Sequence, residues 1–138
     1  MLQVKTKLGK SRKHGIGLFA DQFIKKGTIT WKYTPEFDVS YDKKQIDKMP
    51  EIAKKRFFDF SYFDFNINKY ILCFDDQRFI NHSKNPNISS RPEIDIANKD
   101  IKKGQELTCN YEDYEKNWFK NRKIDKSLFE GTTKPKKK

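Results

Sequence analysis

The polar cluster Arg78–Asn87, which reads RFINHSKNPN, sets the strongest limit on how this chain folds. Its Asn-Pro-Asn end is poor helix material, because the residue before a proline is pushed out of the α region. Phe79 and Ile80 are apolar and expected to be buried, so Asn81–His82–Ser83 must lie just below the surface, where each side chain needs a hydrogen-bond partner. Taken alone, the cluster favours an irregular loop whose Asn and Ser side chains bond their own backbone.

The composition indicates one soluble domain. A length of 138 residues suffices for one modest core, and the hydrophobic content of 35 % includes 12 Phe and 6 Tyr. No apolar run approaches the length of a membrane span and no signal-peptide pattern opens the chain, so an intracellular location without membrane contact is expected. The two cysteines, Cys73 and Cys109, form neither a C-x-x-C pair nor a disulfide framework.

Positive charge is concentrated towards the C-terminal end. The net charge is +11, and the segment from Lys120 to Lys138 carries eight basic residues against Asp125 and Glu130. A polyanion such as nucleic acid is one expected partner of this segment, and a solvated tail that aids solubility is the other interpretation. Residues 131–138 are predicted to be disordered, and their KPKKK end would suit a nuclear address in a eukaryotic host.

Periodicity predicts a mostly β chain with short helices. Residues 1–33 are predicted to form a β-meander with a turn at Gly15–Gly17. Helical spacing over Asp42–Arg56, interrupted by Pro50, predicts one or two short helices, and the aromatic residues at 114, 118 and 119 would share another helical face. Further strands are expected at Thr28–Tyr33, Phe57–Ile67, Tyr70–Phe74, Ile94–Ala97 and Glu106–Tyr111.

Four short motifs follow one another along the chain. They are HGIGLFA (His14–Ala20), RFINHSKNPN (Arg78–Asn87), DIKKG (Asp100–Gly104) and ELTCNY (Glu106–Tyr111). In this combination, over about Lys5–Tyr111, the chain resembles the SET domain of protein-lysine methyltransferases. The resemblance implies a mostly β, β-clip-like fold with few helices. In that fold the C-terminal strand passes under a loop as a pseudoknot and places Asn81–His82 against Tyr111.

The resemblance also implies a domain organisation and a cofactor. Residues 1–119 would form the SET domain, with residues 38–70 as a variable insert that builds one wall of the substrate cleft. Residues 120–138 would be a basic C-terminal segment. The cofactor of the family is S-adenosylmethionine, and its reaction is methyl transfer from a sulfonium to a lysine amine. That chemistry requires no metal.

The same resemblance assigns the site residues. The expected cofactor-binding residues are His14, Gly15, Ile16, Gly17, Arg78, Asn81, His82 and Tyr111, with Trp118 or Phe119 covering the adenine. Tyr111 is the expected catalytic residue, with its hydroxyl near the transferring methyl group. The expected substrate channel is lined by Phe63, Phe65, Cys109 and Tyr114. An aromatic channel lowers the pKa of a lysine amine, which is about 10.4 when free, and so favours its nucleophilic form.

Three positions depart from the family pattern. Lys84 stands where many relatives have Cys, and the chain lacks flanking Cys clusters, so structural zinc is not expected. Asn110 replaces the usual Asp before the catalytic Tyr, which removes a charge but keeps an acceptor. Cys109 stands where relatives often carry Phe or Tyr, and its small side chain suggests room for a methylated amine.

The expected substrate is a lysine of a protein, with histones and other basic chromatin-type proteins as candidates. The alternative is a non-catalytic module that binds chromatin or nucleic acid through the basic residues 120–138. A metal site made of His14, His82, Cys73 and Cys109 is a third interpretation, but its spacing matches no known zinc pattern.

Overall fold

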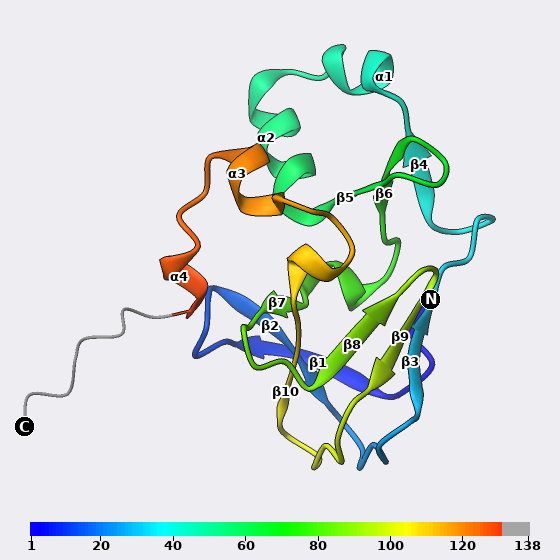
Figure 1. Ribbon diagram of the computed structural model, residues 1–138, viewed down its shortest axis with the longest axis vertical. Coiled ribbons are helices and arrows are strands. Elements are labelled where there is room, and N and C mark those ends of the chain that lie inside the picture. Colours follow the sequence, from blue (N-terminus) through cyan, green and yellow to red (C-terminus); the bar gives the residue numbers. More distant parts are fainter. Residues whose placement is uncertain (131–138) are drawn as a thin grey trace, which may run out of the picture.

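A computed structural model describes residues 1–130, and the tail at 131–138, predicted to be disordered, lies outside the described residues. The strands are β1 (Thr6–Lys10), β2 (Ile16–Ala20), β3 (Ile29–Lys32), β4 (Val39–Tyr41), β5 (Tyr62–Asp64), β6 (Lys69–Leu72), β7 (Asn81–His82), β8 (Ile88–Arg91), β9 (Ile94–Ala97) and β10 (Glu106–Cys109). The helices are α1 (Lys43–Asp47), α2 (Glu51–Phe60), α3 (Trp118–Arg122) and α4 (Ser127–Glu130), with 3-10 turns η1 (Asp76–Phe79) and η2 (Tyr111–Asp113). None of the helices in the described range is long and apolar enough to cross a membrane. The prediction of a mostly β chain with short helices is confirmed (Figure 1).

In the four-stranded sheet, β10 lies between β2 and β7. It runs antiparallel to β2, where Leu107 lies opposite Leu18, and parallel to β7, where Thr108 lies opposite Asn81 and Cys109 opposite His82. A parallel pair needs a long connection, which here is the β8–β9 hairpin and the chain that follows it. This sheet therefore brings three motifs that are far apart in the sequence side by side (Figure 1).

The third strand differs from the predicted meander. β1 and β2 pair antiparallel, as a meander requires, but β3 pairs with β9 in a second sheet of order β3-β9-β8. Sequence periodicity could not show this, because any strand with one apolar face satisfies the same pattern whichever strand it pairs with. The threading of the C-terminal strand as a pseudoknot stays a prediction.

A separate part of the fold carries α1, α2 and the sheet β4-β6-β5, at the top of Figure 1. The two short helices are confirmed: Asp42 and Gln45 form a capping box at the start of α1, and Pro50 is the N-cap of α2. These elements lie across the residues predicted to be the variable insert, 38–70. Their function as a cleft wall stays a prediction.

The strand predicted over Phe57–Ile67 is wrong in its first half. Helix α2 continues to Phe60, and β5 begins only at Tyr62. Alternating aromatic residues over so short a run also suit a helix, since Phe57 and Phe60 are three residues apart and lie near each other on its surface. The helix that starts at Glu51 therefore extends into the aromatic run.

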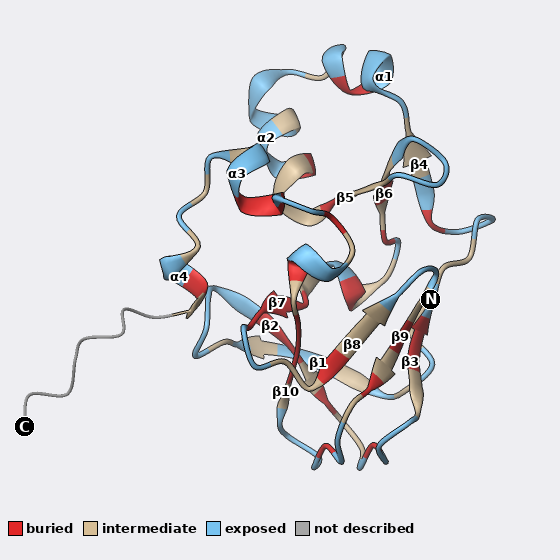
Figure 2. Ribbon diagram, viewed as in Figure 1, coloured by how far each residue is buried: buried red, intermediate tan, exposed pale blue. Residues whose placement is uncertain are grey.

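The main core gathers side chains from β2, β8, β9, β10 and the C-terminal helices (Figure 2). Its aromatic members are Tyr111, Trp118, Phe119 and Phe129. Helix α3 crosses the predicted domain boundary at residue 119, and Phe129 of the predicted basic segment is only 7 % exposed. Because a buried aromatic ring contributes strongly to packing, the chain up to residue 130 is part of the folded domain.

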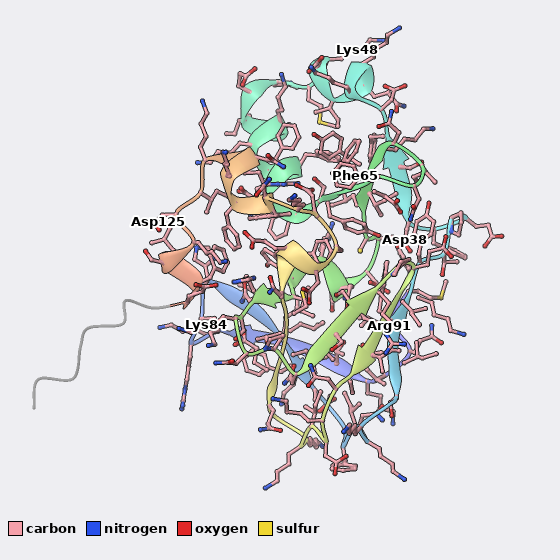
Figure 3. The ribbon with its side chains drawn as sticks, in the orientation of Figure 1. Asp38, Lys48, Phe65, Lys84, Arg91 and Asp125 are labelled. Atoms are coloured by element: carbon pink, nitrogen blue, oxygen red, sulfur yellow. The ribbon has the colours of Figure 1, made fainter. Side chains whose placement is uncertain are left out.

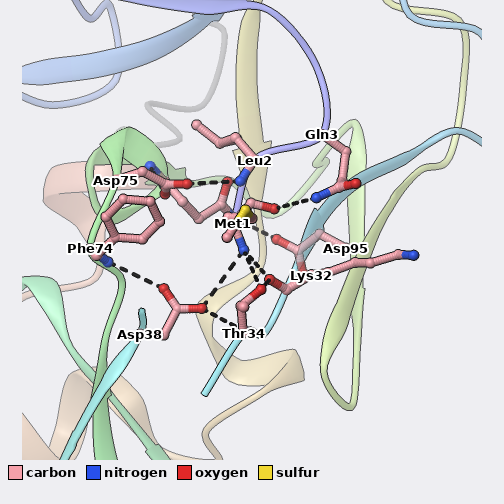
Figure 4. Close-up of polar contacts among 10 residues, drawn as sticks. Met1, Leu2, Gln3, Lys32, Thr34, Asp38, Phe74, Asp75 and Asp95 are labelled. Carbon is pink, nitrogen blue, oxygen red and sulfur yellow. Dashed lines mark hydrogen bonds and ion pairs between the residues drawn. The ribbon is translucent and has the colours of Figure 1, made fainter. Parts of the chain in front are cut away.

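Polar contacts at the start of the chain also fix the approach to the polar cluster (Figure 4). The Met1 ammonium lies 3.7 Å from Oδ2 of Asp38, whose Oδ1 accepts a hydrogen bond from the N–H of Phe74 at 3.2 Å. The N–H of Leu2 donates to Oδ2 of Asp75 at 2.8 Å. Asp75 caps η1, the turn that leads into β7, so these contacts position the strand that carries the Asn-His pair.

Candidate functional site

His82 is fully enclosed, with 0 % of its surface exposed. Its Nδ1 accepts a hydrogen bond from the N–H of Tyr111 at 3.1 Å, and its Nε2 lies 2.8 Å from Oε1 of Glu130. Because Nδ1 is an acceptor, we assign the ring proton to Nε2, which donates it to Glu130. Burial lowers the pKa of His82 against the opposing effect of Glu130, so the imidazole is neutral at neutral pH.

A metal site at His82 finds no support in the described residues. Both ring nitrogens of His82 already have hydrogen-bond partners, and no three His, Cys, Asp or Glu side chains within residues 1–130 gather as metal ligands do. Both cysteines are buried free thiols. The side chain of His14 instead packs on an aromatic ring.

The side-chain amide of Asn81 holds the glycine-rich turn in place. Its Nδ2 donates to the carbonyl of His14 at 2.8 Å and to the carbonyl of Ile16 and Oε1 of Glu106, both at 3.2 Å. The Glu106 carboxylate occupies the space beside Gly17, because a Cβ at this position would lie 2.0 Å from its Oε1 and would displace it. Asn81 thus joins the first motif of the chain to the last.

This acceptor group suits the amino-acid end of S-adenosylmethionine. The carbonyl oxygens of His14 and Ile16 and the carboxylate of Glu106 gather around Nδ2 of Asn81. An ammonium has three N–H donors and requires acceptors of this kind, and an oxygen that already accepts from Asn81 has a second lone pair. Gly15 has a φ of +51°, and no described atom outside its immediate neighbours lies within 4 Å of the place where its Cβ would be. The backbone is therefore open to close approach by a ligand.

Tyr111 begins η2, two residues after the end of β10. Its hydroxyl donates a hydrogen bond to the carbonyl of Ile80 at 2.5 Å, and the residue is 7 % exposed. Burial raises the pKa of Tyr111 well above its ordinary value, so the phenol stays protonated at neutral pH. Its ring packs on Trp118 and Phe119, with centroids 4.6 and 5.8 Å away. The hydroxyl is a fixed hydrogen-bonding group, not a base.

A cavity of about 200 Å³ opens beside Tyr111. Three of the predicted channel residues line it: Phe65, Cys109 and Tyr114. Phe63 is not part of the lining, and its ring packs 4.9 Å from those of Phe65 and Tyr70. Phe65 and Arg91 reach the cavity from the upper and lower parts of the fold (Figure 3).

Besides Tyr111, two residues that the sequence assigned to the cofactor line this cavity. Arg78 is exposed, and its guanidinium lies 5.3 Å from the ring centroid of Phe79. Trp118 is buried, and its Nε1 donates to the carbonyl of Ser61 at 3.3 Å. The structure thus brings both of them to the predicted substrate side of Tyr111.

The cavity is acidic although the protein is basic. Five carboxylates line it against two guanidiniums, a formal net charge of −3 on a chain whose net charge is +11. The carboxylates belong to Asp59, Asp64, Glu93, Asp95 and Asp113, and the guanidiniums to Arg78 and Arg91. Aromatic rings form much of the remaining wall. A wall of this kind favours a ligand with a cationic head and an apolar stem.

Sequence reasoning missed the residues of α4 that pack on the two histidines. The ring of Phe129 stacks on His14 at 4.4 Å and 27°, and Glu130 bonds His82. Phe119, proposed from sequence as an adenine cover, is only 3 % exposed and lies in the core, with its ring 4.8 Å from that of His82. The apolar pair Leu128–Phe129 within an otherwise basic segment is the signal that could have revealed this contact.

Sequence reasoning also gave no role to Asp95. Its carboxylate is 6 % exposed and lines the cavity. In β9, Asp95 and Ala97 are buried while Ile94 and Ile96 are half-buried. Because side chains alternate along a strand, Asp95 faces the same side of β9 as the core residue Ala97. A carboxylate on the core side of a strand could have marked Asp95 as unusual.

Comparison with known proteins agrees with this arrangement. A family model described as the SET domain matches residues 15–112. No curated protein matches the chain. A candidate histone methyltransferase of Plasmodium falciparum has a similar structure, with a TM-score of 0.58 over 80 % of this chain and 95 % of that one. Its identity of 24 % makes it a likeness of fold alone.

Two structures of the Polycomb Repressive Complex 2 of Chaetomium thermophilum are also similar. One, in an autoinhibited conformation bound to S-adenosylmethionine, is 26 % identical, with a TM-score of 0.62 over 86 % of this chain and 16 % of that one. The other, a humanized mutant bound to the inhibitor GSK343, is 27 % identical, with a TM-score of 0.62 over 88 % and 17 %. The chain thus spans less than a fifth of those chains. SET-domain methyltransferases use S-adenosylmethionine, and since the family model covers most of its length, this chain belongs to the SET-domain family.

Proposed function

We propose that this chain is a protein-lysine methyltransferase, which transfers a methyl group from S-adenosylmethionine to a lysine amine of a protein. One observation carries the proposal. Tyr111 contacts His82 through its backbone N–H and lines the acidic cavity with its buried side chain. It therefore lies between the residues suited to the cofactor and a cavity suited to a cationic side chain.

The cofactor, when bound, supplies the methyl group on a positively charged sulfonium. The carbonyls of His14 and Ile16, with the Glu106 carboxylate, suit its ammonium end. The exposed ring of His14, which stacks on Phe129, offers aromatic surface for the adenine, and the neutral ring of His82 lies buried next to Phe129. Asn81 keeps the acceptors in place, because its amide bonds all three of them.

The cavity would prepare the lysine amine for attack. A free lysine, with a pKa of about 10.4, is mostly protonated and is a poor nucleophile. The aromatic wall, which includes Tyr62 and Trp118, disfavours the charged form, while the carboxylates of the cavity attract it. The cavity would therefore draw in the ammonium, and the amine would attack after it has lost its proton to solvent. The same wall restricts the alkyl stem to one approach, and such alignment accounts for a large share of rate enhancement.

Tyr111 and the Ile80 carbonyl would act on the transferring methyl group. Its hydrogen atoms are polarised by the sulfonium and make weak C–H···O contacts with oxygen acceptors. The Tyr111 hydroxyl is suited to accept such a contact, because it donates its own proton to Ile80 and its lone pairs remain available. Neither oxygen needs to change its protonation state.

The proposed substrate class is a basic protein, with histones as the first candidates. The formal charge of −3 on the cavity supports it. The alternative, nucleic-acid binding through residues 120–138, is weakened for the described part of that segment. There, Arg122 pairs with Glu115, and Lys126 pairs with Glu112 and Glu130.

The direct test is a methylation assay with labelled S-adenosylmethionine against core histones, ribosomal proteins and host extract. Mass spectrometry of each labelled band then identifies the modified residue and the number of methyl groups. The expected result is a label on lysine that disappears with Tyr111→Phe. Cofactor binding by calorimetry without transfer to any lysine, or a label on another residue type, would contradict the proposal.

A further inference from the structure

Asp95 is a buried carboxylate without a cationic partner among residues 1–130. It is 6 % exposed and forms no ion pair within that range. Its Oδ2 accepts one hydrogen bond, from Nε2 of Gln77 at 2.7 Å, and Gln77 is itself only 6 % exposed. Burial of an unpaired charge is costly, so an arrangement of this kind calls for a partner from outside.

The titratable groups around Asp95 cannot supply that partner. Four side chains from different elements respond to its negative charge, namely Tyr62, Cys73, Cys109 and Tyr114. Burial is the main cause that raises the pKa of each, and the carboxylate raises it further, so all four are neutral at neutral pH. The two arginines of the cavity wall, Arg78 and Arg91, are exposed and form no ion pair with Asp95.

Polar atoms without partners surround the same carboxylate. Trp31 and Ser90 lie opposite Asp95 on the two neighbouring strands, β3 and β8. Within residues 1–130, Trp31 Nε1 and Ser61 Oγ are buried without a hydrogen-bond partner. Trp31 is 4 % and Ser61 3 % exposed, and both residues line the cavity. Buried polar groups are rarely left unpaired, so this end of the cavity is built for a polar ligand.

We propose that Asp95, held by Gln77, binds the cationic end of the substrate side chain, a primary or methylated alkylammonium, and so selects amines over neutral side chains. The inference rests on the proposed function and names a specificity-determining residue for it. Asp95, Cys109 and Tyr111 line one cavity, so an alkylammonium that enters beside Tyr111 shares the cavity with the carboxylate. The carboxylate attracts every such cation by its charge, and an ammonium that keeps an N–H adds a charge-assisted hydrogen bond, about twice as strong as a neutral one. The aromatic wall covers the alkyl stem.

The first test measures binding without catalysis. Titration calorimetry with n-butylammonium and n-butyltrimethylammonium compares the wild-type chain with Asp95→Asn, Asp95→Leu and Glu36→Gln. Glu36 is an exposed carboxylate outside the cavity and controls for the change in net charge. Loss of the charged contact should weaken the binding of both cations by about tenfold or more in each Asp95 variant. Glu36→Gln should bind like the wild type, and n-butanol should not distinguish the four proteins.

The second test measures methylation of a lysine peptide. Asp95→Asn should raise the KM for the peptide while the affinity for S-adenosylmethionine stays at the wild-type value. If the wild type methylates lysine and the Asp95 variants match it in both KM and alkylammonium binding, the inference is overturned while the proposed function stands. If the wild type binds alkylammonium but methylates no lysine, and Asp95→Asn does not bind alkylammonium, the proposed function fails and Asp95 is still a cation site. Circular dichroism confirms that each variant is folded.

Discussion

The hydroxyl of Tyr111 donates a hydrogen bond to the main-chain carbonyl of Ile80, 2.5 Å away and 31 residues earlier in the chain. Ile80 directly precedes β7, and Tyr111 follows β10, so the bond joins the two strands that run parallel at the site. A second bond, from the N–H of Tyr111 to His82, fixes the backbone independently of the side-chain hydroxyl. Loss of the hydroxyl therefore removes one functional group and leaves the backbone contact intact.

Tyr111→Phe should abolish most of the methyl transfer and preserve the cofactor site. We expect kcat to fall by about 100-fold or more, because a single positioned polar group in an active site contributes that much. Cofactor affinity, measured by calorimetry, should match the wild type, since His82 keeps its bond to the backbone. Tyr70→Phe is the control, because Tyr70 packs on Phe63 outside the cavity. Wild-type turnover by Tyr111→Phe would refute the catalytic assignment.

Phe129→Ala should weaken cofactor binding and, because its ring is buried in the core, should also destabilise the fold. If Phe129 covers the adenine beside His14 and His82, loss of its ring removes a stacking contact of about 1–3 kcal/mol, or about 5- to 150-fold in affinity. The measurement is calorimetric titration with S-adenosylmethionine. Leu128→Ala is the matched control, since Leu128 lies in the same short helix and is 58 % exposed. Equal affinities for the two variants would exclude Phe129 from the cofactor site.

The sequence sufficed for the motifs because each one has a local physical requirement. The turn favours glycine at position 15, where φ is +51°, and the predicted strand Glu106–Tyr111 shows its apolar pattern within six residues. The sequence does not predict which motifs lie side by side, because β10 lies between β2 and β7 and no local pattern encodes that pairing. The family resemblance supplied the expectation that Asn81–His82 lies against Tyr111. The structure adds the two hydrogen bonds of Tyr111, one to His82 and one to Ile80.

The sequence marks Phe129 and Asp95 as unusual, but the contacts that they make depend on tertiary packing. Helix α4 has four residues, fewer than a periodic pattern needs, and its packing depends on a histidine more than 100 positions away. Asp95 lies in a correctly predicted strand, but its environment comes from η1, β3 and β8. A carboxylate in a strand is ordinarily placed on the solvent face, and only tertiary packing reveals that this one is buried.

Glu115→Ala should destabilise the domain strongly. Glu115 is 1 % exposed and pairs with Arg122 at 2.5 Å, and it also accepts the N–H of Phe63 at 2.6 Å. Removal of one partner leaves a buried guanidinium unpaired, which costs about 3–5 kcal/mol. Urea unfolding followed by circular dichroism measures the change.

The exposed pair of Lys126 and Glu112 is the control for this effect. Its atoms are 3.3 Å apart, but the side chains are 40 % and 36 % exposed. Solvent screening limits such a pair to about 1 kcal/mol or less, so Glu112→Ala should barely change the free energy of unfolding. Similar losses for the two variants would show that burial does not distinguish the two ion pairs.

Asp95→Asn should stabilise the protein at neutral pH, in contrast to its expected loss of function. Burial raises the pKa of Asp95 from 3.8 to about 6 in the folded state, against the hydrogen bonds from Ser90 and Gln77. The folded protein therefore holds this proton more tightly than the unfolded chain. The stabilising contribution is fully present below about pH 4 and is lost as the pH rises through about 6. A shift of about two units corresponds to about 3 kcal/mol.

An asparagine at position 95 cannot ionise, and its amide oxygen can still accept the hydrogen bond from Gln77. The free energy of unfolding of Asp95→Asn, relative to the wild type, should therefore rise by a few kcal/mol between about pH 4.5 and about pH 7.5. Urea unfolding at both pH values measures it, with Glu93→Gln as the exposed control. A difference that is independent of pH would mean that Asp95 is not an unpaired buried charge. A stabilised variant that no longer binds alkylammonium would show that the wild-type chain retains a destabilising carboxylate for function.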